Sequence, residues 1–234
     1  MNIQILHLIE GAKKAEGLAV IIDVFRAFSL EPYLFAAGAE KIRPVGSIEE
    51  TFSWRERDPG CFLIGERHGR MIEGCDMGNS PSSIDPKAIR GRQIIHTTSA
   101  GTQGIANAVR AAEVLTGSFV NARAVASYIR NKAPEKVSLV AMGKEGILPA
   151  EEDELCARYL SALIRGDEMP EIDRLLRDLQ TGGGSHFFDP ALQDIYPEKD
   201  FHLCIRRDIF DFVIRVERDA DGFIAKRKKS LKTL

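Results

Sequence analysis

The amino-acid sequence predicts a layered α/β fold in which short buried strands alternate with helices. Strands covered on both faces, as in parallel sheets, read as continuous apolar runs. Such runs occur at residues 18–24, 61–65, 93–96 and 137–141. Helical patterns occupy residues 32–38, 48–57, 105–112 and 122–130. Alternating strand and helix signals of this kind are typical of α/β architectures.

The last third of the sequence has a different character. Helical patterns at residues 150–165 and 171–179 indicate a helical insert after residue 148, followed by a glycine-rich loop at residues 181–186. Residues 212–225 then predict a C-terminal hairpin that turns at Asp221 and Gly222, a pair that favours tight turns. The basic run beyond the hairpin is expected to be a solvated tail.

Length and charge predict one enzyme-sized domain. The chain has 234 residues, with 32 Lys and Arg against 34 Asp and Glu, and the formal net charge of -2 does not favour a nucleic-acid-binding protein. Neither a signal peptide nor an apolar run long enough to span a bilayer is expected. We therefore expect one domain over residues 1–234, with a subdivision near residue 148 as the alternative. The sequence leaves a homodimer open.

The cysteines and histidines show no metal-binding spacing. The four cysteines are widely separated and lack a C-x-x-C pair, which argues against a zinc site or a disulfide framework. A reducing cytoplasm is the expected location. Among the histidines only His68, in a glycine-rich loop, is a functional candidate.

Asp23 ends the first apolar run, and Arg26 follows three positions later. Burying a carboxylate without a partner is costly, so a metal ion or a nearby cation would stabilise Asp23. The alternative is that Asp23 caps a helix or pairs with Arg26, while Ser29 caps the helix whose first turn carries Pro32. Asp23 alone does not distinguish these interpretations.

The stretch GERHGRMIEGCDMGNSP, residues 65–81, combines four glycines with many charged side chains. Arg67 and Arg70 offer forked donors that match phosphate or sulfonate oxygens. Glu66, Glu73 and Asp76 offer the hard oxygen ligands that Mg²⁺ prefers. Because glycines let backbone N–H groups approach an anion, we expect this loop to hold a metal and a phosphate together. The alternative is a solvated, charged hairpin.

The segment HTTSAGTQG, residues 96–104, leads from an apolar run into a helix. Backbone donors at a helix N-terminus together with threonine hydroxyls can bind an anion, although an ordinary capped turn has the same pattern. The chain has no G-x-x-x-x-G-K-[ST] motif, which disfavours a P-loop nucleotidase.

Glu152 and Asp153 begin the helix predicted after residue 148. At about 100° per residue both fall within its apolar stripe, so they face the interior. They are metal or acid/base candidates if they reach the ligand-binding edge of the sheet. Stabilisation by the helix dipole is the structural alternative.

Taken together, these segments resemble the 2-phosphosulfolactate phosphatase family of coenzyme M biosynthesis. The resemblance lies in Asp23-Val-Phe-Arg-Ala27 with Ser29, Gly65-Glu-Arg-x-Gly69, Asp76-x-Gly-Asn-Ser-Pro81, Thr97-Thr-x-x-Gly-Thr102 and Glu152-Asp-x-x-Cys156. Single motifs of this length are weakly specific, but their order and separation together are fairly specific.

The resemblance implies a Mg²⁺-dependent phosphatase for a small phosphorylated 2-hydroxy acid, built as a three-layer α/β/α fold with a mixed, largely parallel sheet. Metal binding or water activation is assigned to Asp23, Glu66 and Asp76, with Glu152 and Asp153 as further metal candidates. The phosphate and acid groups of the substrate are assigned to Arg26, Arg67 and Arg70. Further substrate contacts are assigned to Asn79, Ser80, Thr97, Thr98, Gly101 and Thr102.

Two rival interpretations remain at this point. Within the enzyme class, Asp23 is a nucleophile that forms an aspartyl-phosphate instead of a metal ligand or base. Outside that class, the chain is a non-catalytic protein that binds a phosphorylated or sulfonated metabolite. The surplus of carboxylates favours an enzyme, because acids beside an anionic ligand weaken the affinity of a simple receptor.

Overall fold

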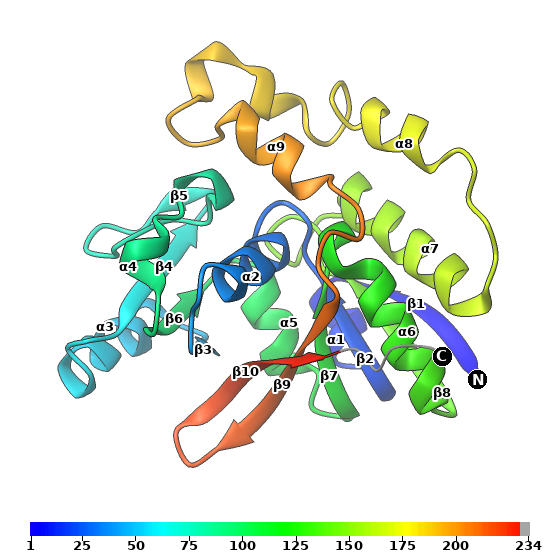
Figure 1. The fold of residues 1–234 in the computed structure, drawn as a ribbon, viewed down its shortest axis with the longest axis horizontal. Helices are drawn as coiled ribbons and strands as arrows, with labels where there is room; N and C mark the ends of the chain where they lie inside the picture. The colour runs from blue at the N-terminus through cyan, green and yellow to red at the C-terminus, as the bar shows by residue number, and fades with distance from the viewer. Residues whose placement is uncertain (230–234) are drawn as a thin grey trace.

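A mixed sheet runs through the molecule (Figure 1), and the computed structural model describes residues 1–229. Within residues 1–229 ten strands form this sheet, and neighbouring strands follow the order β1-β8-β2-β7-β9-β10-β3-β6-β4-β5. They are β1 (Asn2–His7), β2 (Gly17–Ile22), β3 (Lys41–Pro44), β4 (Phe62–Arg67), β5 (Arg70–Met71), β6 (Gln93–Thr97), β7 (Ala111–Gly117), β8 (Lys136–Ala141), β9 (Phe212–Asp219) and β10 (Gly222–Lys229).

The sheet contains two parallel groups joined by a hairpin. Strands β1, β8, β2 and β7 pair in parallel, and β3, β6 and β4 form the second parallel group. Between them, β9 pairs antiparallel with β7, and β10 pairs antiparallel with both β9 and β3. The predicted mixed, largely parallel sheet is thus confirmed.

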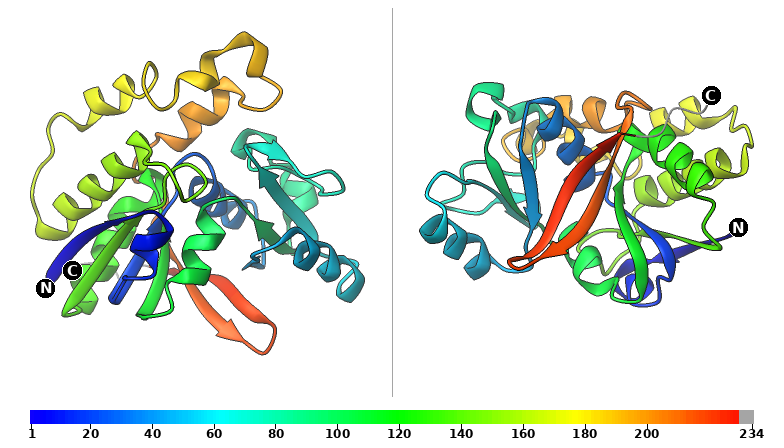
Figure 2. Two further views of the ribbon diagram at one scale, coloured as in Figure 1. Left: turned by 180° about the vertical axis from the view of Figure 1, so that it is seen from behind. Right: turned by 60° about the horizontal axis from the view of Figure 1, so that its bottom comes forward.

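Helices cover both faces of the sheet (Figure 2). They are α1 (Leu8–Ala12), α2 (Ala27–Ala36), α3 (Ile48–Arg57), α4 (Pro86–Ile89), α5 (Gly101–Asn107), α6 (Ala122–Lys132), α7 (Glu151–Arg165), α8 (Ile172–Asp178) and α9 (Glu198–Cys204). Leu18, Val20 and Ile22 of β2 pack with α6 and α7. Ala19 and Ile21, which point to the other face, pack with α1, α2 and α5. The alternation confirms the three-layer α/β/α architecture.

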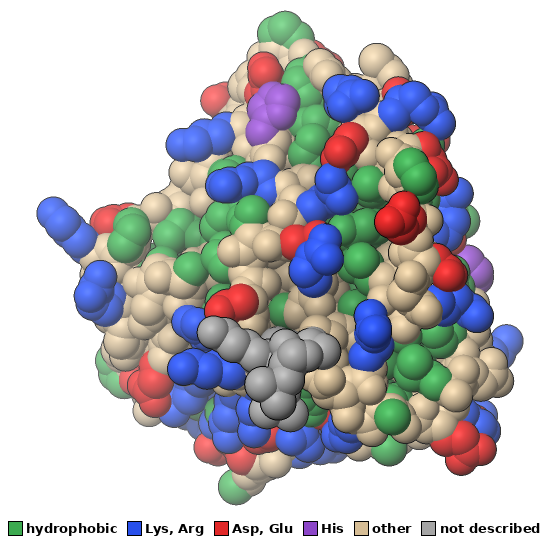
Figure 3. Space-filling view, turned by 45° about the vertical axis from the view of Figure 1, so that its right-hand side comes forward, with side chains coloured by type: hydrophobic (Ala, Val, Ile, Leu, Met, Phe, Trp, Pro, Cys, Tyr) green, Lys and Arg blue, Asp and Glu red, His purple; other side chains and the backbone are tan. Residues whose placement is uncertain are grey.

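The chain beyond α7 lies across the top of the layers in Figure 1, where α8 and α9 pass over α7 and α2. Residues after 148 therefore supply a helical cover, as predicted, and then return to the sheet as β9 and β10. No helix within residues 1–229 is long and apolar enough to cross a membrane. On the face in Figure 3, acidic and basic side chains are interspersed over most of the surface.

The start of α2 differs from the prediction. The helix begins at Ala27, so Ser29 and Pro32 lie inside it, and the expectation that Ser29 caps the helix is wrong. Pro32 lacks the N–H that would bond to the carbonyl of Phe28 in a regular helix. Ser118 Oγ donates to that carbonyl oxygen at 3.0 Å, so Pro32 is tolerated in mid-helix.

The helix predicted at residues 105–112 is also wrong in part. Helix α5 ends at Asn107, and Ala111 already belongs to β7, which lies between β2 and β9 in the sheet. The alanines have a helical preference, but strand pairing on both sides decides their conformation.

The C-terminal hairpin is confirmed, with its turn one residue earlier than predicted. Gly222 pairs with Asp219, so Ala220 and Asp221 form the turn. The basic run at residues 226–229 is the second half of β10, not a tail. Two of its lysines form ion pairs with Glu217 of β9.

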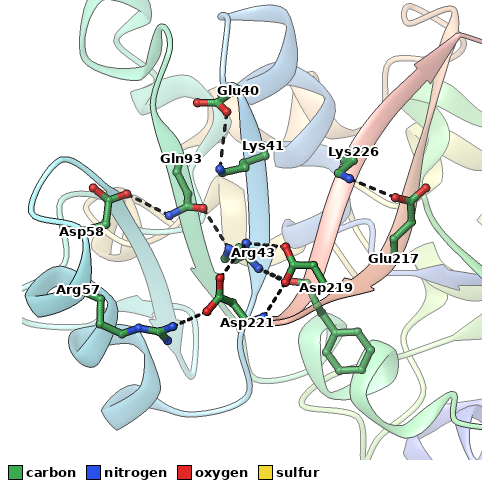
Figure 4. Close-up of polar contacts among 11 residues, drawn as sticks. Glu40, Lys41, Arg43, Arg57, Asp58, Gln93, Glu217, Asp219, Asp221 and Lys226 are labelled. Atoms are coloured by element: carbon green, nitrogen blue, oxygen red, sulfur yellow. Dashed lines mark hydrogen bonds and ion pairs between the residues drawn. The ribbon is translucent and has the colours of Figure 1, made fainter.

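Arg43 of β3 fastens this hairpin to the second parallel group (Figure 4). Its Nη1 and Nη2 donate to the two carboxylate oxygens of Asp219 at 2.9 and 2.7 Å. Its Nε donates to Gln93 Oε1 at 3.0 Å, and its guanidinium lies 4.8 Å from the ring centre of Trp54. The side chain of Arg43 is buried, so these partners replace its hydration.

Arg43→Lys is expected to lower the free energy of unfolding by about 2 kcal/mol, because an ammonium cannot reach Gln93 and the hairpin at once. Urea unfolding measures this change. The matched control is Arg57→Lys, which alters a half-exposed pair with Asp221 and is expected to cost less than about 1 kcal/mol. Equal losses in the two variants would contradict the role of Arg43.

Candidate active site

A cavity of about 650 Å³ lies at the carboxyl ends of strands from both parallel groups. Asp23 follows β2 and Gly143 follows β8, whereas Glu66 is the last residue but one of β4 and Ser99 follows β6. The first turn of α7 forms another wall, and residues 182–196 line the side nearest α9. Ligands of open α/β sheets bind at this edge, so the cavity is the candidate site.

We call it the acid cavity, after the four buried carboxylates that line it: Asp23, Glu66, Glu152 and Asp153. All four were predicted site residues. Among residues 1–229, no three His, Cys, Asp or Glu side chains lie close enough together to form a ready-made metal cluster.

Asp23 is both a helix cap and a cavity residue. Its Oδ1 accepts a hydrogen bond at 3.2 Å from the N–H of Ala27, the first residue of α2. A Cβ atom at Gly101 would lie only 2.9 Å from Asp23 Oδ2, so a glycine leaves that oxygen accessible. Burial, and next the neighbouring Glu66 carboxylate, raise the pKa of Asp23 to about 7.

Glu66 is held by backbone groups of two loops. Its Oε2 accepts from the N–H of Gly69 at 2.8 Å, and its Oε1 accepts from the N–H of Ser99 at 2.6 Å. The Gly69 bond closes a two-residue turn between β4 and β5, in which His68 and Gly69 both have positive φ. The predicted loop is therefore a tight hairpin, and its acid Glu66 faces the cavity.

Two further acids, Glu152 and Asp153, enter the cavity from the first turn of α7. Asp153 accepts from the N–H of Val24 at 2.8 Å and from the N–H of Gly143 at 2.7 Å, so it joins the chain just beyond β2 and β8. Burial, and next the charge of Glu152, raise the pKa of Asp153 well above its usual range. Burial also raises the pKa of Glu152 to about 7.

Arg26 lines the same cavity but does not pair with Asp23. Its Nη1 donates to Asp200 Oδ2 at 2.8 Å, and its Nη2 donates to the carbonyl of Gly69 at 3.0 Å. The rings of Tyr196 and Phe187 lie 5.1 and 5.9 Å from the guanidinium. The alternative in which Asp23 and Arg26 form a structural ion pair is therefore wrong.

Asn79 reaches the cavity from the loop after the hairpin, and a buried polar chain fixes its amide. Its Oδ1 lies 2.9 Å from His96 Nε2, and His96 Nδ1 lies 3.3 Å from Glu31 Oε1. Thr116 Oγ1 donates to the other carboxylate oxygen of Glu31 at 3.0 Å. With its oxygen engaged by His96, Asn79 presents its amino group as a donor.

The rim of the cavity combines two histidines with Tyr196. Burial, and next the charge of Arg26, lower the pKa of His186 to about 4, so its imidazole is neutral near pH 7. Tyr196 donates to the carbonyl of His68 at 3.2 Å. His68 Nδ1 lies 2.7 Å from Glu145 Oε1, which connects the hairpin tip to the loop after β8. His68 was the one predicted histidine candidate, and it lines the rim.

The structure does not bring every predicted site residue to the cavity. Arg67 follows Glu66 on the same strand and faces away, donating to Thr97 Oγ1 at 3.0 Å and to the Glu66 carbonyl. Asp76 accepts from the N–H of Leu63 at 2.7 Å and pairs with Arg55. Asp76 is thus not grouped with Asp23 and Glu66.

The remaining candidates do not line the cavity. Thr98 and Thr102 are buried and cap each other at the start of α5, as the capped-turn alternative expects. Ser80 donates to Asp200 Oδ1 at 3.0 Å. Arg70 is exposed on β5 and does not line the cavity.

Sequence reasoning missed three residues of the site. Asp200 is fully buried on the inner face of α9, four residues before Cys204. An acid on an apolar helical stripe, the signal that identified Glu152 and Asp153, could have found it. His186 lies in a single 3-10 turn (Ser185–Phe188) and Tyr196 in the loop before α9, segments too short for a periodic signal to mark them.

Comparison with known proteins yields one consistent result. The sequence model of the 2-phosphosulpholactate phosphatase family matches residues 3–219. A Carboxydothermus hydrogenoformans protein is 42% identical over 130 residues, about half of each chain (55% and 54%). Proteins from Caldicellulosiruptor saccharolyticus and Bacillus subtilis are 33% and 26% identical over 85% and 86% of this chain and 88% of their own. All three are named probable 2-phosphosulfolactate phosphatases.

The raised pKa of Asp23 predicts a pH dependence of stability. In the folded chain it is about 7, above the value of about 3.9 for an unperturbed aspartate, so ionisation between these limits favours the unfolded state. Without divalent cations, Asp23→Asn is expected to gain melting temperature relative to the wild type as pH rises from about 4 to about 7. Melting curves in EDTA test this, and parallel curves for the two proteins would contradict it.

Proposed function

Since this chain belongs to the 2-phosphosulfolactate phosphatase family, we propose that it hydrolyses the phosphate ester of a small 2-hydroxy acid, 2-phosphosulfolactate or a close analogue, with Mg²⁺ as cofactor. The observation that carries this proposal is the crowding of Asp23, Glu66 and Glu152 around one cavity that also contains Arg26. Acids alone would repel a phosphate dianion, whereas acids with a divalent cation and an arginine can bind one.

The residues of the acid cavity fit Mg²⁺. The cation prefers carboxylate oxygens and is commonly held by one or two carboxylates together with waters and substrate phosphate. Asp23 Oδ2 and the carboxylate of Glu152 suit this requirement, because within residues 1–229 neither accepts a hydrogen bond from another residue's backbone, in contrast to both oxygens of Glu66 and of Asp153. Bound there, Mg²⁺ would neutralise charge on the transferring phosphoryl group.

The side chains of the cavity have separable roles in this proposal. Arg26 and the amino group of Asn79 bind phosphate oxygens: Arg26 is a cation with more N–H groups than its bonds to Asp200 and Gly69 use, and the oxygen of the Asn79 amide is already engaged by His96. Glu66, whose two oxygens accept from the N–H groups of Gly69 and Ser99, orients a water molecule. Asp23 Oδ2 contacts the cation or accepts the proton of the attacking water.

The other features of the chain agree with a small acidic substrate and a reducing compartment. Lys144 and the N-terminus of α7 lie at the cavity and favour an anionic ligand. All four cysteines are free and buried, which supports the expected cytoplasmic location. The non-catalytic binding protein remains the rival, and turnover distinguishes the two.

Phosphate release from a panel of 2-phospho-hydroxy acids, including 2-phosphosulfolactate, is expected to require Mg²⁺. Removing the metal with EDTA leaves the crowded carboxylates to repel the substrate, so turnover should stop and return on addition of Mg²⁺. Undiminished turnover after metal removal would contradict the cofactor. Tight binding of the panel without phosphate release would favour the binding protein.

Two arginine variants test which guanidinium serves the phosphate. Arg26→Lys is expected to lower kcat/KM by about a hundredfold, because a lysine keeps the charge but loses the planar fork. Arg67→Lys, on the opposite face of β4, is expected to change kcat/KM by less than about threefold. The reverse order would contradict the placement of the site and restore the sequence-based assignment of Arg67.

A further inference from the structure

Arg26 is a cation in a cavity lined by carboxylates, yet it does not pair with them. It follows Asp23 by three residues and lines the same cavity as Asp23, Glu66 and Glu152. An arginine in such surroundings is attracted to the nearest carboxylates, and opposite charges attract more strongly in a buried site than in water. Yet the guanidinium of Arg26 donates its hydrogen bonds to Asp200 and to the carbonyl of Gly69. Its charge is thus directed away from the acids of the cavity.

Asp200 is built into the fold to receive that charge. Its side chain is completely buried, and one carboxylate oxygen pairs with Arg26 at 2.8 Å. The other oxygen accepts from Ser80 Oγ at 3.0 Å and from the N–H of Ser82 at 2.9 Å. These contacts tie α9 to the loop after the hairpin, so the carboxylate cannot follow Arg26 if the guanidinium moves.

The surroundings of the guanidinium also limit its movement. The Tyr196 ring packs beside it, and a Cβ atom at Gly69 would lie 1.8 Å from the hydroxyl of Tyr196. Glycine at position 69 therefore lets the ring approach the hairpin closely. The ring, the Gly69 carbonyl and Asp200 therefore hold the guanidinium from three sides.

We propose that Asp200 is a positioning residue that keeps Arg26 from neutralising the acid cavity, so that the carboxylates remain free for a divalent cation and the arginine for the substrate anion. The assignment rests on the proposed function. Without the carboxylate at position 200, Arg26 loses its buried counter-charge and turns toward the acids that line the same cavity, Asp23 and Glu66 among them. It then competes with the cation for the same oxygens.

Calorimetric titration of the full-length protein with Mg²⁺, without substrate, tests this assignment. Asp200→Asn is expected to weaken Mg²⁺ binding at least tenfold, since an uncompensated guanidinium occupies the acids. The double variant Arg26→Met/Asp200→Asn is expected to bind Mg²⁺ within about threefold of the wild type, because both charges of the pair are removed. The matched control is Asp208→Asn, which disturbs another partly buried acid outside the cavity and should leave Mg²⁺ affinity unchanged.

The outcomes separate the possibilities. Wild-type affinity in Asp200→Asn, or equal losses in the single and double variants, would overturn the positioning role. If Asp200→Asn does not fold, a folded double variant with wild-type affinity shows that Asp200 acts through Arg26, whereas an unfolded double variant overturns the proposal. A wild-type protein that binds no Mg²⁺ would contradict the proposed function instead.

Discussion

The burial of several carboxylates in one cavity is the constraint around which this molecule is organised. Asp23, Glu66, Glu152 and Asp153 line one cavity. Burial raises the pKa values of Asp23, Glu152 and Asp153, and neighbouring carboxylates raise those of Asp23 and Asp153 further. The fold meets this cost in two ways. Backbone N–H groups from four different loops stabilise Glu66 and Asp153, while Asp23 and Glu152 keep pKa values near 7. A bound cation would stabilise the ionised forms of Asp23 and Glu152, which connects the architecture to the proposed chemistry.

The same carboxylates position the surrounding elements. Asp153 joins the ends of β2 and β8, Asp23 begins α2, and Glu66 closes the hairpin between β4 and β5 against the loop after β6. The cover formed by α8 and α9 is attached through the pair of Arg26 and Asp200. Loss of one of these acids is thus expected to affect both stability and chemistry, so variants must be compared by binding or pH dependence and not by activity alone.

Much of the fold could be predicted from the sequence, because fully buried strands and amphipathic helices have distinct apolar periods. Strand β7 could not, since its alanines favour a helix and only pairing with β2 and β9 makes it a strand. In the site, successive side chains along β4 point to opposite faces of the sheet, so Glu66 and Arg67 cannot both reach the cavity. The helical stripe of α9 could have marked Asp200 as buried, but not its partner Arg26, because the two residues are 174 positions apart and only the fold brings them together.

If the acid cavity binds Mg²⁺ as proposed, its protonated carboxyl groups must lose their protons when the cation binds. Calorimetric titration with Mg²⁺ at pH 7, in two buffers of different ionisation enthalpy, counts the protons that binding releases. With the pKa values of Asp23 and Glu152 both near 7, the account predicts release of roughly one proton per bound Mg²⁺ at pH 7, falling toward zero by about pH 9. Binding of Mg²⁺ at pH 7 with no proton release would contradict it.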